Sequence, residues 1–441
     1  MVQNVVKMED NTASDLNYFD RVKCFVSEKA RYFHLQSPVK DSFYSLFKDP
    51  LIKDKVTSLN IMIDYFDSIG MNHKRSIYLA EQLLDSWNSS LETVEEKFWA
   101  VSNGFLPDRI ELYGLDKNNI KDYLSDFDYL LLHPINNFFA FWINDKITLK
   151  YVLQSPLLLN RTKGVKIDLM PEYYLYIEND GHYSYLMDSP NIKKSKNYLL
   201  DLLKEKGVLA LKPSNGAGGK GFIKLSYNDA KNAIFCNDKK ISNMEWDSFV
   251  NSLNGYIVTE YIFQHKELEK VCPGSACTLR IIASRQQNDG YDGGMANVFV
   301  SYARFGTKLS HGASNLSSGG VGIPFDFNTG RFGHYFYRYK KFAQGRDYKY
   351  KSHPDTGIEL YNQLLPNWEM VKDAVYALCD HFSSLEYFGF DIIITDSGLK
   401  LCEINTLPSM DYEQVMCGPV YSKKAASEFF LNKIGGKFGL L

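Results

Sequence analysis

The feature that most constrains the fold of this 441-residue chain is a pair of short apolar strands near its carboxyl end. Residues 390–405 read FDIIITDSGLKLCEIN, in which a Thr-Asp-Ser-Gly turn separates two runs rich in isoleucine and leucine. Such a pattern predicts an antiparallel β-hairpin. Folding it about Ser397 places Asp391 opposite Glu403. Glu403 shares a strand face with Asn405, because side chains alternate along a strand.

Two carboxylates and one amide oxygen would therefore converge on one patch of the hairpin. Such hard oxygen ligands suit Mg²⁺, which retains several waters and completes its coordination with substrate phosphates. We predict that Asp391, Glu403 and Asn405 bind metal. The alternative is a hairpin whose polar residues face water, because alternation is typical of any half-exposed hairpin.

A glycine-rich loop is the second informative feature. Residues 209–225 read LALKPSNGAGGKGFIKL, so that a predicted strand enters, four glycines follow within six residues, and a strand leaves. Glycine allows close backbone approach to a ligand, and successive N–H groups can cradle phosphate oxygens. Lys212 and Lys220 bracket the loop. It is neither a P-loop nor a dinucleotide-binding fingerprint, because a strand follows it. The alternative is an ordinary hairpin tip.

A phosphate cradle together with a metal site is what an ATP-dependent enzyme requires. Between the two lies an apolar strand, residues 256–262, whose backbone could bind an adenine edge or which is an ordinary buried strand. Arg280 interrupts another apolar strand and needs a partner, either a bidentate oxyanion or a core carboxylate.

The rest of the chain supplies elements without obvious chemistry. Apolar residues at helical spacing predict helices over 15–33, 52–69, 74–87 and 118–132, and residues 89–92 offer a capping box for a helix that runs to Val101. Later segments predict a helix over 143–153, a strand over 170–177, and helices over 197–206 and 368–384. Further strands are expected over 277–285 and 295–305. Clustered strands with single helices indicate an α+β fold with antiparallel sheet.

Composition excludes several classes of protein. Lys and Arg number 50 against 52 Asp and Glu, so no nucleic-acid footprint is expected. The first 14 residues lack the apolar core of a secretion signal, and the most apolar stretch, residues 129–142, is too short to span a bilayer. Seven dispersed cysteines fit reduced thiols, so we expect a cytoplasmic protein without a transmembrane segment.

In this order, Lys146, KPSNGAGGKG, VTEYI, CTLRI, NLSSGG and the FGFDIII…LCEIN hairpin resemble an ATP-grasp enzyme. More narrowly, the chain resembles the sugar-transfer-associated ATP-grasp proteins of bacterial polysaccharide loci, of the kind linked to teichuronopeptide synthesis. The resemblance covers roughly residues 140 to 420. It implies an ATP-grasp fold, in which two α+β subdomains grip ATP, preceded here by a mainly helical N-terminal region.

The resemblance also assigns roles to individual residues. The ATP-binding residues that it implies are Lys146, Lys212, Ser214, Gly216, Gly218, Gly219, Lys220, Glu260, Tyr261, Ile262 and Glu267. Glu269 is an alternative to Glu267 for the ribose. Arg280, with Lys212 and Lys220, would act on the transferring phosphate, and two Mg²⁺ would bind at the hairpin. We also expect a substrate carboxylate to dock near Arg304, Lys308 and Asn315, from their position alone.

The reaction implied is the joining of a carboxylate to an amine through an acyl phosphate. Such a ligase would attach an amino acid to a uronic-acid sugar or to another amino acid, in the synthesis of a surface polysaccharide or capsule. The alternatives are an ATP-dependent kinase and a non-catalytic nucleotide-binding partner protein. Small-molecule acid and amine substrates are expected, with docking to polysaccharide-assembly enzymes as a further hypothesis. The expected divisions are a helical region over 1–125, a linking segment over 126–206, and subdomains over 207–262 and 263–441.

Overall fold

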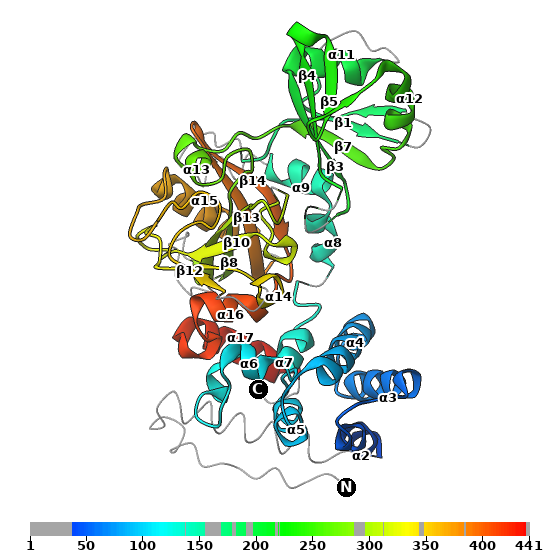
Figure 1. The fold of residues 1–441 in the computed structure, drawn as a ribbon, viewed down its shortest axis with the longest axis vertical. Helices are drawn as coiled ribbons and strands as arrows, with labels where there is room; N and C mark the ends of the chain where they lie inside the picture. Colours follow the sequence, from blue (N-terminus) through cyan, green and yellow to red (C-terminus); the bar gives the residue numbers. More distant parts are fainter. Residues whose placement is uncertain are drawn as a thin grey trace. The chain divides into compact units, whose positions relative to one another are not determined.

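The computed structural model describes residues 38–136, 138–154, 169–178, 182–190, 197–216, 219, 221–285, 296–311, 313–343, 348–382 and 385–437. The chain divides into two compact units. One comprises Met1–Gly114 with Ser125–Leu131, and the other Leu115–Leu124 with Leu132–Leu441. Figure 1 shows the elements of both units in sequence colours.

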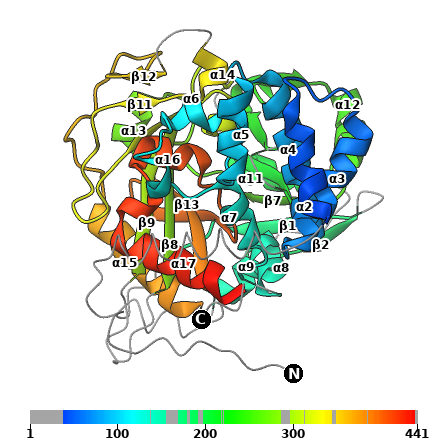
Figure 2. The ribbon, with the colours of Figure 1, turned by 90° about the horizontal axis from the view of Figure 1, so that it is seen from below.

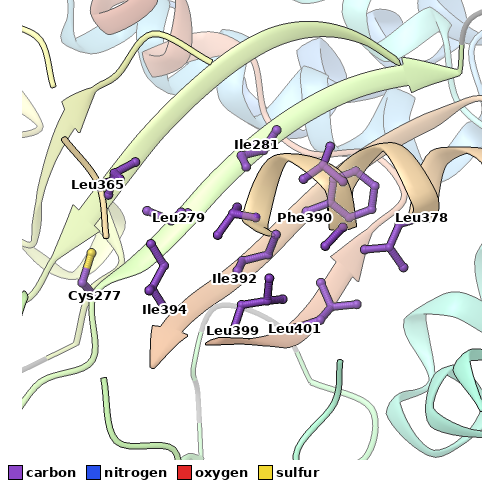
Figure 3. Packing of buried hydrophobic residues seen from close by; sticks show 14 of the residues in the cluster. Cys277, Leu279, Ile281, Leu365, Leu378, Phe390, Ile392, Ile394, Leu399 and Leu401 are labelled. Atoms are coloured by element: carbon purple, nitrogen blue, oxygen red, sulfur yellow. The ribbon is translucent and has the colours of Figure 1, made fainter. Parts of the chain in front are cut away.

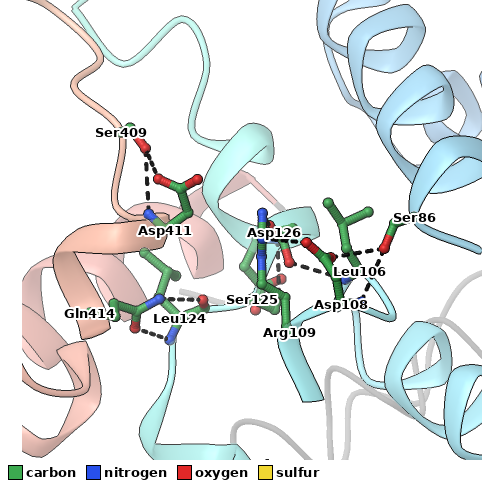
Figure 4. Close-up of polar contacts among 11 residues, drawn as sticks. Ser86, Leu106, Asp108, Arg109, Leu124, Ser125, Asp126, Ser409, Asp411 and Gln414 are labelled. Atoms are coloured by element: carbon green, nitrogen blue, oxygen red, sulfur yellow. Dashed lines mark hydrogen bonds and ion pairs between the residues drawn. The ribbon is translucent and has the colours of Figure 1, made fainter. Parts of the chain in front are cut away.

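The first unit is helical among its described residues, as the sequence predicts. Its helices are α2 (Pro38–Ser45), η1 (Leu46–Lys48), α3 (Lys55–Ser68), α4 (His73–Ser89), α5 (Val94–Ser102), α6 (Arg109–Tyr113) and α7 (Asp126–Leu131). Phe43, Phe66 and Trp87 are fully buried between them. The helix predicted over 15–33 lies outside the described residues. In Figure 4, Arg109 pairs with Asp108 and Asp126 of the same unit.

Two helix predictions in this part of the chain are wrong in detail. The capping box is not formed by residues 89–92. It is formed by Thr93 and Glu96 at the start of α5, because α4 continues to Ser89. The helix predicted over 118–132 is interrupted after η2 (Ile120–Asp122), where Tyr123 is extended. Leu124 then exchanges two backbone hydrogen bonds with the Gln414 side chain, at 2.9 and 3.0 Å, which replace helical bonds (Figure 4).

The second unit contains a small antiparallel sheet of seven strands among the described residues. In the order β2-β1-β7-β3-β4-β5-β6 they are β2 (Tyr183–Tyr185), β1 (Tyr173–Ile177), β7 (Tyr256–Glu260), β3 (Val208–Pro213), β4 (Ile223–Asn228), β5 (Ala233–Cys236) and β6 (Lys239–Ile241). Helices α11 (Tyr198–Lys206) and α12 (Asn243–Asn251) bury Leu202 and Trp246 against this sheet (Figure 1). As predicted, α11 ends at Gly207, whose φ is positive.

A larger antiparallel sheet carries the hairpin. Its strands, in the order β12-β11-β10-β9-β8-β13-β14, are β12 (Lys349–Tyr350), β11 (Phe336–Tyr337), β10 (Val321–Pro324), β9 (Ala296–Phe305), β8 (Thr278–Arg285), β13 (Tyr387–Thr395) and β14 (Gly398–Asn405). One face packs against α15 (Trp368–His381). Figure 3 shows the core there, to which Leu279, Ile281, Ile392 and Leu378 all belong.

The opposite face of the large sheet is polar near its centre. Asp391, Arg280 and Tyr302 stand side by side on β13, β8 and β9, so they share one face and alternate with the apolar residues under α15. Helices α16 (Asp411–Cys417) and α17 (Lys424–Lys437) pack on this face, where the Tyr302 hydroxyl contacts Glu413 and the Tyr387 ring stacks on Phe429. Both helices are red in Figure 2.

The remaining helices of the second unit lie before, between and after the strands along the chain. They are α8 (Phe139–Asn144), α9 (Lys146–Leu153), α13 (Lys266–Val271), α14 (Lys340–Ala343) and the 3₁₀ turns η4 (Asp229–Lys231), η5 (Leu316–Ser318) and η6 (Val420–Ser422). The small sheet includes β1 and β2, which precede residue 207. The predicted domain boundaries stay a prediction. The α+β class is confirmed, since both sheets are antiparallel.

Within the described ranges, no helix is both long and apolar enough to cross a bilayer.

Candidate active site

The hairpin forms as predicted, with Asp391 directly opposite Glu403. A two-residue turn joins β13 to β14, and Gly389 pairs with Asn405 in the same ladder. The Asn405 amide lies 3.5 Å from Glu403 Oε1, which confirms that the two side chains share a face. The three predicted metal-binding side chains are therefore brought together.

Two guanidinium groups flank Asp391. Arg280 donates two hydrogen bonds to its carboxylate, at 2.6 and 3.1 Å, and Arg304 Nη2 lies 2.8 Å from Oδ2. Arg304 also donates to Thr278 and to the Asn315 side chain, at 2.9 and 3.2 Å. Arg280 thus pairs with a core carboxylate, one of the two alternatives for its partner, and that carboxylate belongs to the predicted metal site.

The electrostatics of the two carboxylates differ sharply. Burial alone would raise the pKa of Asp391, but Arg280 and Arg304 outweigh it and lower the pKa to about 2. Burial and the adjacent Asp391 carboxylate raise the pKa of Glu403, and Lys146 only partly opposes this rise. The neighbouring cationic side chains therefore do not hold the pKa of Glu403 at its ordinary value.

Two predicted phosphate-binding lysines lie beside Glu403. Lys146 begins α9, whose N-cap is Asp145, and its Nζ is 3.8 Å from Glu403 Oε2 and donates to the Gly216 carbonyl at 2.6 Å. The pKa of Lys146 and the pKa of Lys212 are both lowered, because burial disfavours the charged ammonium group. The Glu403 carboxylate opposes this effect only in part. The glycine-rich loop and the hairpin thus meet, although they are distant in sequence.

The glycine-rich loop connects β3 to β4, as predicted. A Cβ at Gly219 would lie 3.1 Å from the Asn315 amide, so the glycine-rich loop closely approaches the NLSSGG stretch, residues 315–320. Gly219 has φ +71°. The Ser214 amide donates to the Gly255 carbonyl. Gly218 and Lys220 lie outside the described residues, and their assigned roles stay predictions.

The residues assigned to the adenosine end of ATP lie at the end of β7 and just after it. Glu260 ends this strand, and its carboxylate accepts from the Glu172 amide and lies 3.6 Å from Lys400. Tyr261 and Ile262 are half-buried in the next turn. Their roles in ATP binding stay predictions.

The two residues that the resemblance offers for the ribose differ in their surroundings. Glu269 accepts from Gln264 and from the Gly274 amide, both at 2.7 Å, and so supports its own loop. Glu267 is exposed at the start of α13, with Lys270 at 2.8 Å. The assignment of either residue to the ribose stays a prediction.

Sequence reasoning missed two buried polar groups, one beside the guanidinium pair and one beside Lys212. The Tyr302 hydroxyl donates to Glu413 Oε1 at 2.8 Å, while the buried Oε2 has no hydrogen-bond partner among the described residues. The Tyr173 hydroxyl is likewise buried without such a partner, and its ring lies 5.5 Å from Lys212 Nζ. No local motif marks either residue, because each position depends on long-range packing.

Glu413→Gln should stabilise the protein at pH 8 and have little effect at pH 5. Burial, then Asp411, raises the pKa of Glu413 to about 7, against opposing effects of Tyr302 and Arg280. Tyr339 and Tyr387 also face it and are neutral in this range. Between its ordinary pKa and pH 7 the folded protein keeps a proton that the unfolded chain has lost, so stability falls as pH rises.

The expected gain at pH 8 is roughly 3 kcal/mol in the free energy of unfolding, measured by chemical denaturation at both pH values. Glu359→Gln, at an exposed position, is the control. An equal effect of Glu413→Gln at pH 5 and pH 8 would contradict the assignment.

The hairpin residues fit a hard divalent cation. They offer two carboxylates and one amide oxygen, and the raised pKa of Glu403 reflects a shortage of positive charge. Among the described residues, no group of three or more His, Cys, Asp or Glu could hold a metal ion. The third donor here is the amide of Asn405, so the set rests on two carboxylates.

Comparison with protein families decides the assignment. The sequence matches the sugar-transfer associated ATP-grasp family over residues 142–427. The chain belongs to this family. The match covers both sheets, the glycine-rich loop and the hairpin, so the predicted ATP-grasp fold is confirmed. No curated protein sequence matches the chain.

Several solved ATP-grasp structures are distantly similar to this family member. The ADP complex of N5-carboxyaminoimidazole ribonucleotide synthetase has 11% identity and TM-score 0.32, covering 61% of this chain and 46% of that one. D-alanine–D-alanine ligase from Bacillus anthracis has 16% identity and TM-score 0.29, covering 67% and 66%. VanG D-Ala:D-Ser ligase from Enterococcus faecalis has 13% and 0.30, covering 68% and 62%. The chain spans less than two thirds of the length of each, and the family match alone carries the assignment.

Proposed function

We propose that this protein is an ATP- and Mg²⁺-dependent carboxylate–amine ligase. The observation that carries the proposal is that Lys146 joins the glycine-rich loop to the hairpin, with Nζ 2.6 Å from the Gly216 carbonyl and 3.8 Å from Glu403. A phosphate cradle and a set of metal-binding oxygens are thereby held against each other, as phosphoryl transfer from ATP requires.

In the first step, different residues bind the phosphates, hold the transferred group and bind the metal. A substrate carboxylate oxygen attacks the γ-phosphorus of ATP, the bond from that phosphorus to the β–γ bridging oxygen breaks, and ADP leaves. Lys146 and Lys212 bind the phosphates. Arg280, which is hydrogen-bonded to Asp391 through Nε and Nη2, would use its remaining N–H groups to hold the oxygens of the group being transferred. Asp391, Glu403 and Asn405 would hold Mg²⁺, which when bound neutralises phosphate charge. The protein contributes positioning and charge stabilisation.

The second step forms the amide. The amine nitrogen attacks the acyl carbon, the carbon–oxygen bond to phosphate breaks, and the amine gives up a proton. Arg304 lies beside Asp391 and Asn315, where it can hold the oxyanion of the addition intermediate or the substrate carboxylate. We propose an amino acid as one substrate and a uronic-acid sugar or a second amino acid as the other, in bacterial surface polysaccharide synthesis.

The test begins with thermal melting of the full chain with ATP, ADP and GTP, each with and without Mg²⁺. A ligand that binds only the folded state adds about 2.7 kcal/mol at a hundred times its dissociation constant. A Mg²⁺-dependent shift with ATP, followed by phosphate release that needs both an acid and an amine, is the expected result. A reaction that needs no amine, transfers phosphate to an acceptor and releases no free phosphate would instead identify a kinase.

Lys212→Met should weaken ATP binding about 10- to 100-fold, because a charge-assisted contact to phosphate is worth about 1.5–3 kcal/mol. Methionine retains an apolar stem beside the Tyr173 ring. Calorimetric titration with ATP measures the effect, and Lys231→Met, at an exposed position in η4, is the control. Unchanged ATP affinity in Lys212→Met would count against the phosphate cradle.

A further inference from the structure

The Tyr173 hydroxyl is a buried polar group beside the candidate active site. Tyr173 is the first residue of β1 and is completely buried. Its hydroxyl oxygen has no hydrogen-bond partner in the part of the chain that the structure describes. Native proteins leave few buried polar groups unpaired, because each one costs free energy. We therefore expect this hydroxyl to have a partner that the described residues do not supply.

Tyr173 and Lys212 stand on the same face of the small sheet. Tyr173 pairs with Thr259 of β7. Thr259 pairs in turn with Ala210 of β3, which is two residues before Lys212. Because side chains alternate along a strand, all four belong to one face. Lys212 Nζ lies 5.5 Å from the centre of the Tyr173 ring. The buried hydroxyl and a predicted phosphate-binding lysine are thus neighbours.

The Tyr173 ring is held in a fixed position. Asp188 accepts a hydrogen bond from the Tyr173 amide at 2.8 Å and pairs with Lys150 at 2.9 Å. Lys150 Nζ also donates to the Pro171 carbonyl at 2.8 Å and lies 5.5 Å from the centre of the Tyr173 ring. The position of the hydroxyl is therefore set before any ligand binds, which lowers the entropic cost of using it as a contact.

Lys212, unlike Lys150, has no partner that could neutralise its charge. Among the described residues it forms neither a hydrogen bond nor an ion pair, and it is half-buried. An ammonium group and a hydroxyl, both able to donate, thus lie near each other without acceptors. A water molecule could satisfy the hydroxyl, but it would leave the ammonium without a counter-charge. A phosphate oxygen would satisfy both groups, because it combines negative charge with several lone pairs.

The hydroxyl lies within electrostatic reach of the hairpin. Burial raises the pKa of Tyr173, so the hydroxyl keeps its proton at neutral pH and remains a donor. The further causes of this rise are Cys402, Asp145 and Glu403. Glu403 is the carboxylate that lies 3.8 Å from Lys146 Nζ. The hydroxyl is therefore near the place where the glycine-rich loop and the hairpin meet.

We infer that the Tyr173 hydroxyl donates a hydrogen bond to a phosphate oxygen of ATP that Lys212 also binds. The inference rests on the proposed ligase function and adds a neutral donor to the two lysines of its phosphate site. In this structure the hydroxyl is enclosed, and Lys146 Nζ bonds to the Gly216 carbonyl oxygen. When ATP binds, one phosphate oxygen takes the place of that carbonyl at Lys146, and another meets Lys212 and the hydroxyl.

Tyr173→Phe tests the inference, because it removes only the hydroxyl and keeps the ring beside Lys212. Calorimetric titration of the full chain with ATP and Mg²⁺ should show about tenfold weaker binding, as expected for the loss of a hydrogen bond to a charged acceptor. Without ATP, the melting temperature should stay the same or rise, because the lost hydroxyl had no partner in the folded protein. A purely structural role would instead lower it.

Tyr387→Phe is the matched control. Tyr387 lies on β13 and is also completely buried, and its hydroxyl likewise lacks a partner among the described residues. No role in ATP binding is assigned to it. This variant should also keep its melting temperature, but it should bind ATP as tightly as the wild type does.

Comparison with Lys212→Met separates this inference from the ligase proposal. If Lys212→Met weakens ATP binding and Tyr173→Phe does not, the hydroxyl does not contact phosphate, and the inference falls while the ligase proposal stands. An equal loss of affinity in Tyr387→Phe, or a lower melting temperature of Tyr173→Phe without ATP, also overturns it. If the wild-type chain does not bind ATP, the ligase proposal fails as well. Weaker ATP binding by Tyr173→Phe with an undiminished melting temperature supports the inference.

Discussion

Glu403→Gln should reduce ATP-dependent turnover by at least about 10²-fold while leaving the fold intact. The substitution keeps the shape of the side chain and removes its charge. Removing one preorganised electrostatic group from an active site typically lowers turnover about 10²- to 10³-fold. Glu403 lies between Asp391 and Lys146, and its raised pKa indicates that its carboxylate is poorly compensated by protein groups alone.

The Mg²⁺-dependent part of the ATP-induced thermal shift is the most direct measurement of this effect. It should disappear in Glu403→Gln, while the shift produced by ATP without Mg²⁺ remains, because Lys212 and Lys146 are retained. Glu386→Gln, at the residue before β13 and paired with Lys433, is a matched control. A normal Mg²⁺ effect in Glu403→Gln would place the metal elsewhere.

The hairpin could be predicted because its two strands and its turn are adjacent in the sequence. The alternating strands and the turn residues predict the hairpin, but the two-residue turn alone would place Asp391 opposite Cys402. A register shift between Asp391 and Ile392 brings Glu403 opposite Asp391, so the predicted pairing is reached through an irregularity that no motif marks. The glycine-rich loop is local in the same sense. Lys146, by contrast, was assigned only from the family resemblance, since nothing in its own segment points to a phosphate.

The surroundings of the hairpin were not predictable, because they depend on strand pairing across long separations. Arg280 meets Asp391 through the pairing of β8 with β13, 111 residues apart in sequence. Sequence left its partner open between an oxyanion and a carboxylate. The Tyr302–Glu413 contact spans the same separation of 111 residues, and no short motif encodes it. Packing of α16 on the polar face decides these contacts.

These long-range pairings change the expectation for one variant of the predicted metal site. From sequence alone, Asp391→Ala would abolish turnover and spare the fold. In the structure, the Asp391 side chain is 6% exposed and serves both Arg280 and Arg304, whose side chains are 11% and 6% exposed. Removing it leaves two buried guanidinium groups without their counter-ion. We therefore expect Asp391→Ala to lose about 3–5 kcal/mol in the free energy of unfolding as well as turnover.

Chemical denaturation measures this loss of unfolding free energy. Repeating the measurement at several pH values tests whether the loss comes from the ionised Asp391 carboxylate. Because the pKa of Asp391 is lowered to about 2, its contribution is present above its ordinary pKa and disappears only as pH falls through about 2. The difference between wild type and Asp391→Ala should thus be constant from pH 5 to pH 8. Asp396→Ala, at the exposed hairpin turn, should cost little.

A compensating variant shows whether unpaired charge or lost packing destabilises Asp391→Ala. Replacing all three charged groups, as Asp391→Leu/Arg280→Met/Arg304→Met, removes the buried charges together, and apolar residues of similar volume often restore or exceed the original stability. Stability should therefore return to near that of wild type, while turnover stays absent. If the triple variant is as unstable as Asp391→Ala, packing rather than charge holds these three strands together, and the guanidinium pair is not what makes Asp391 necessary for folding.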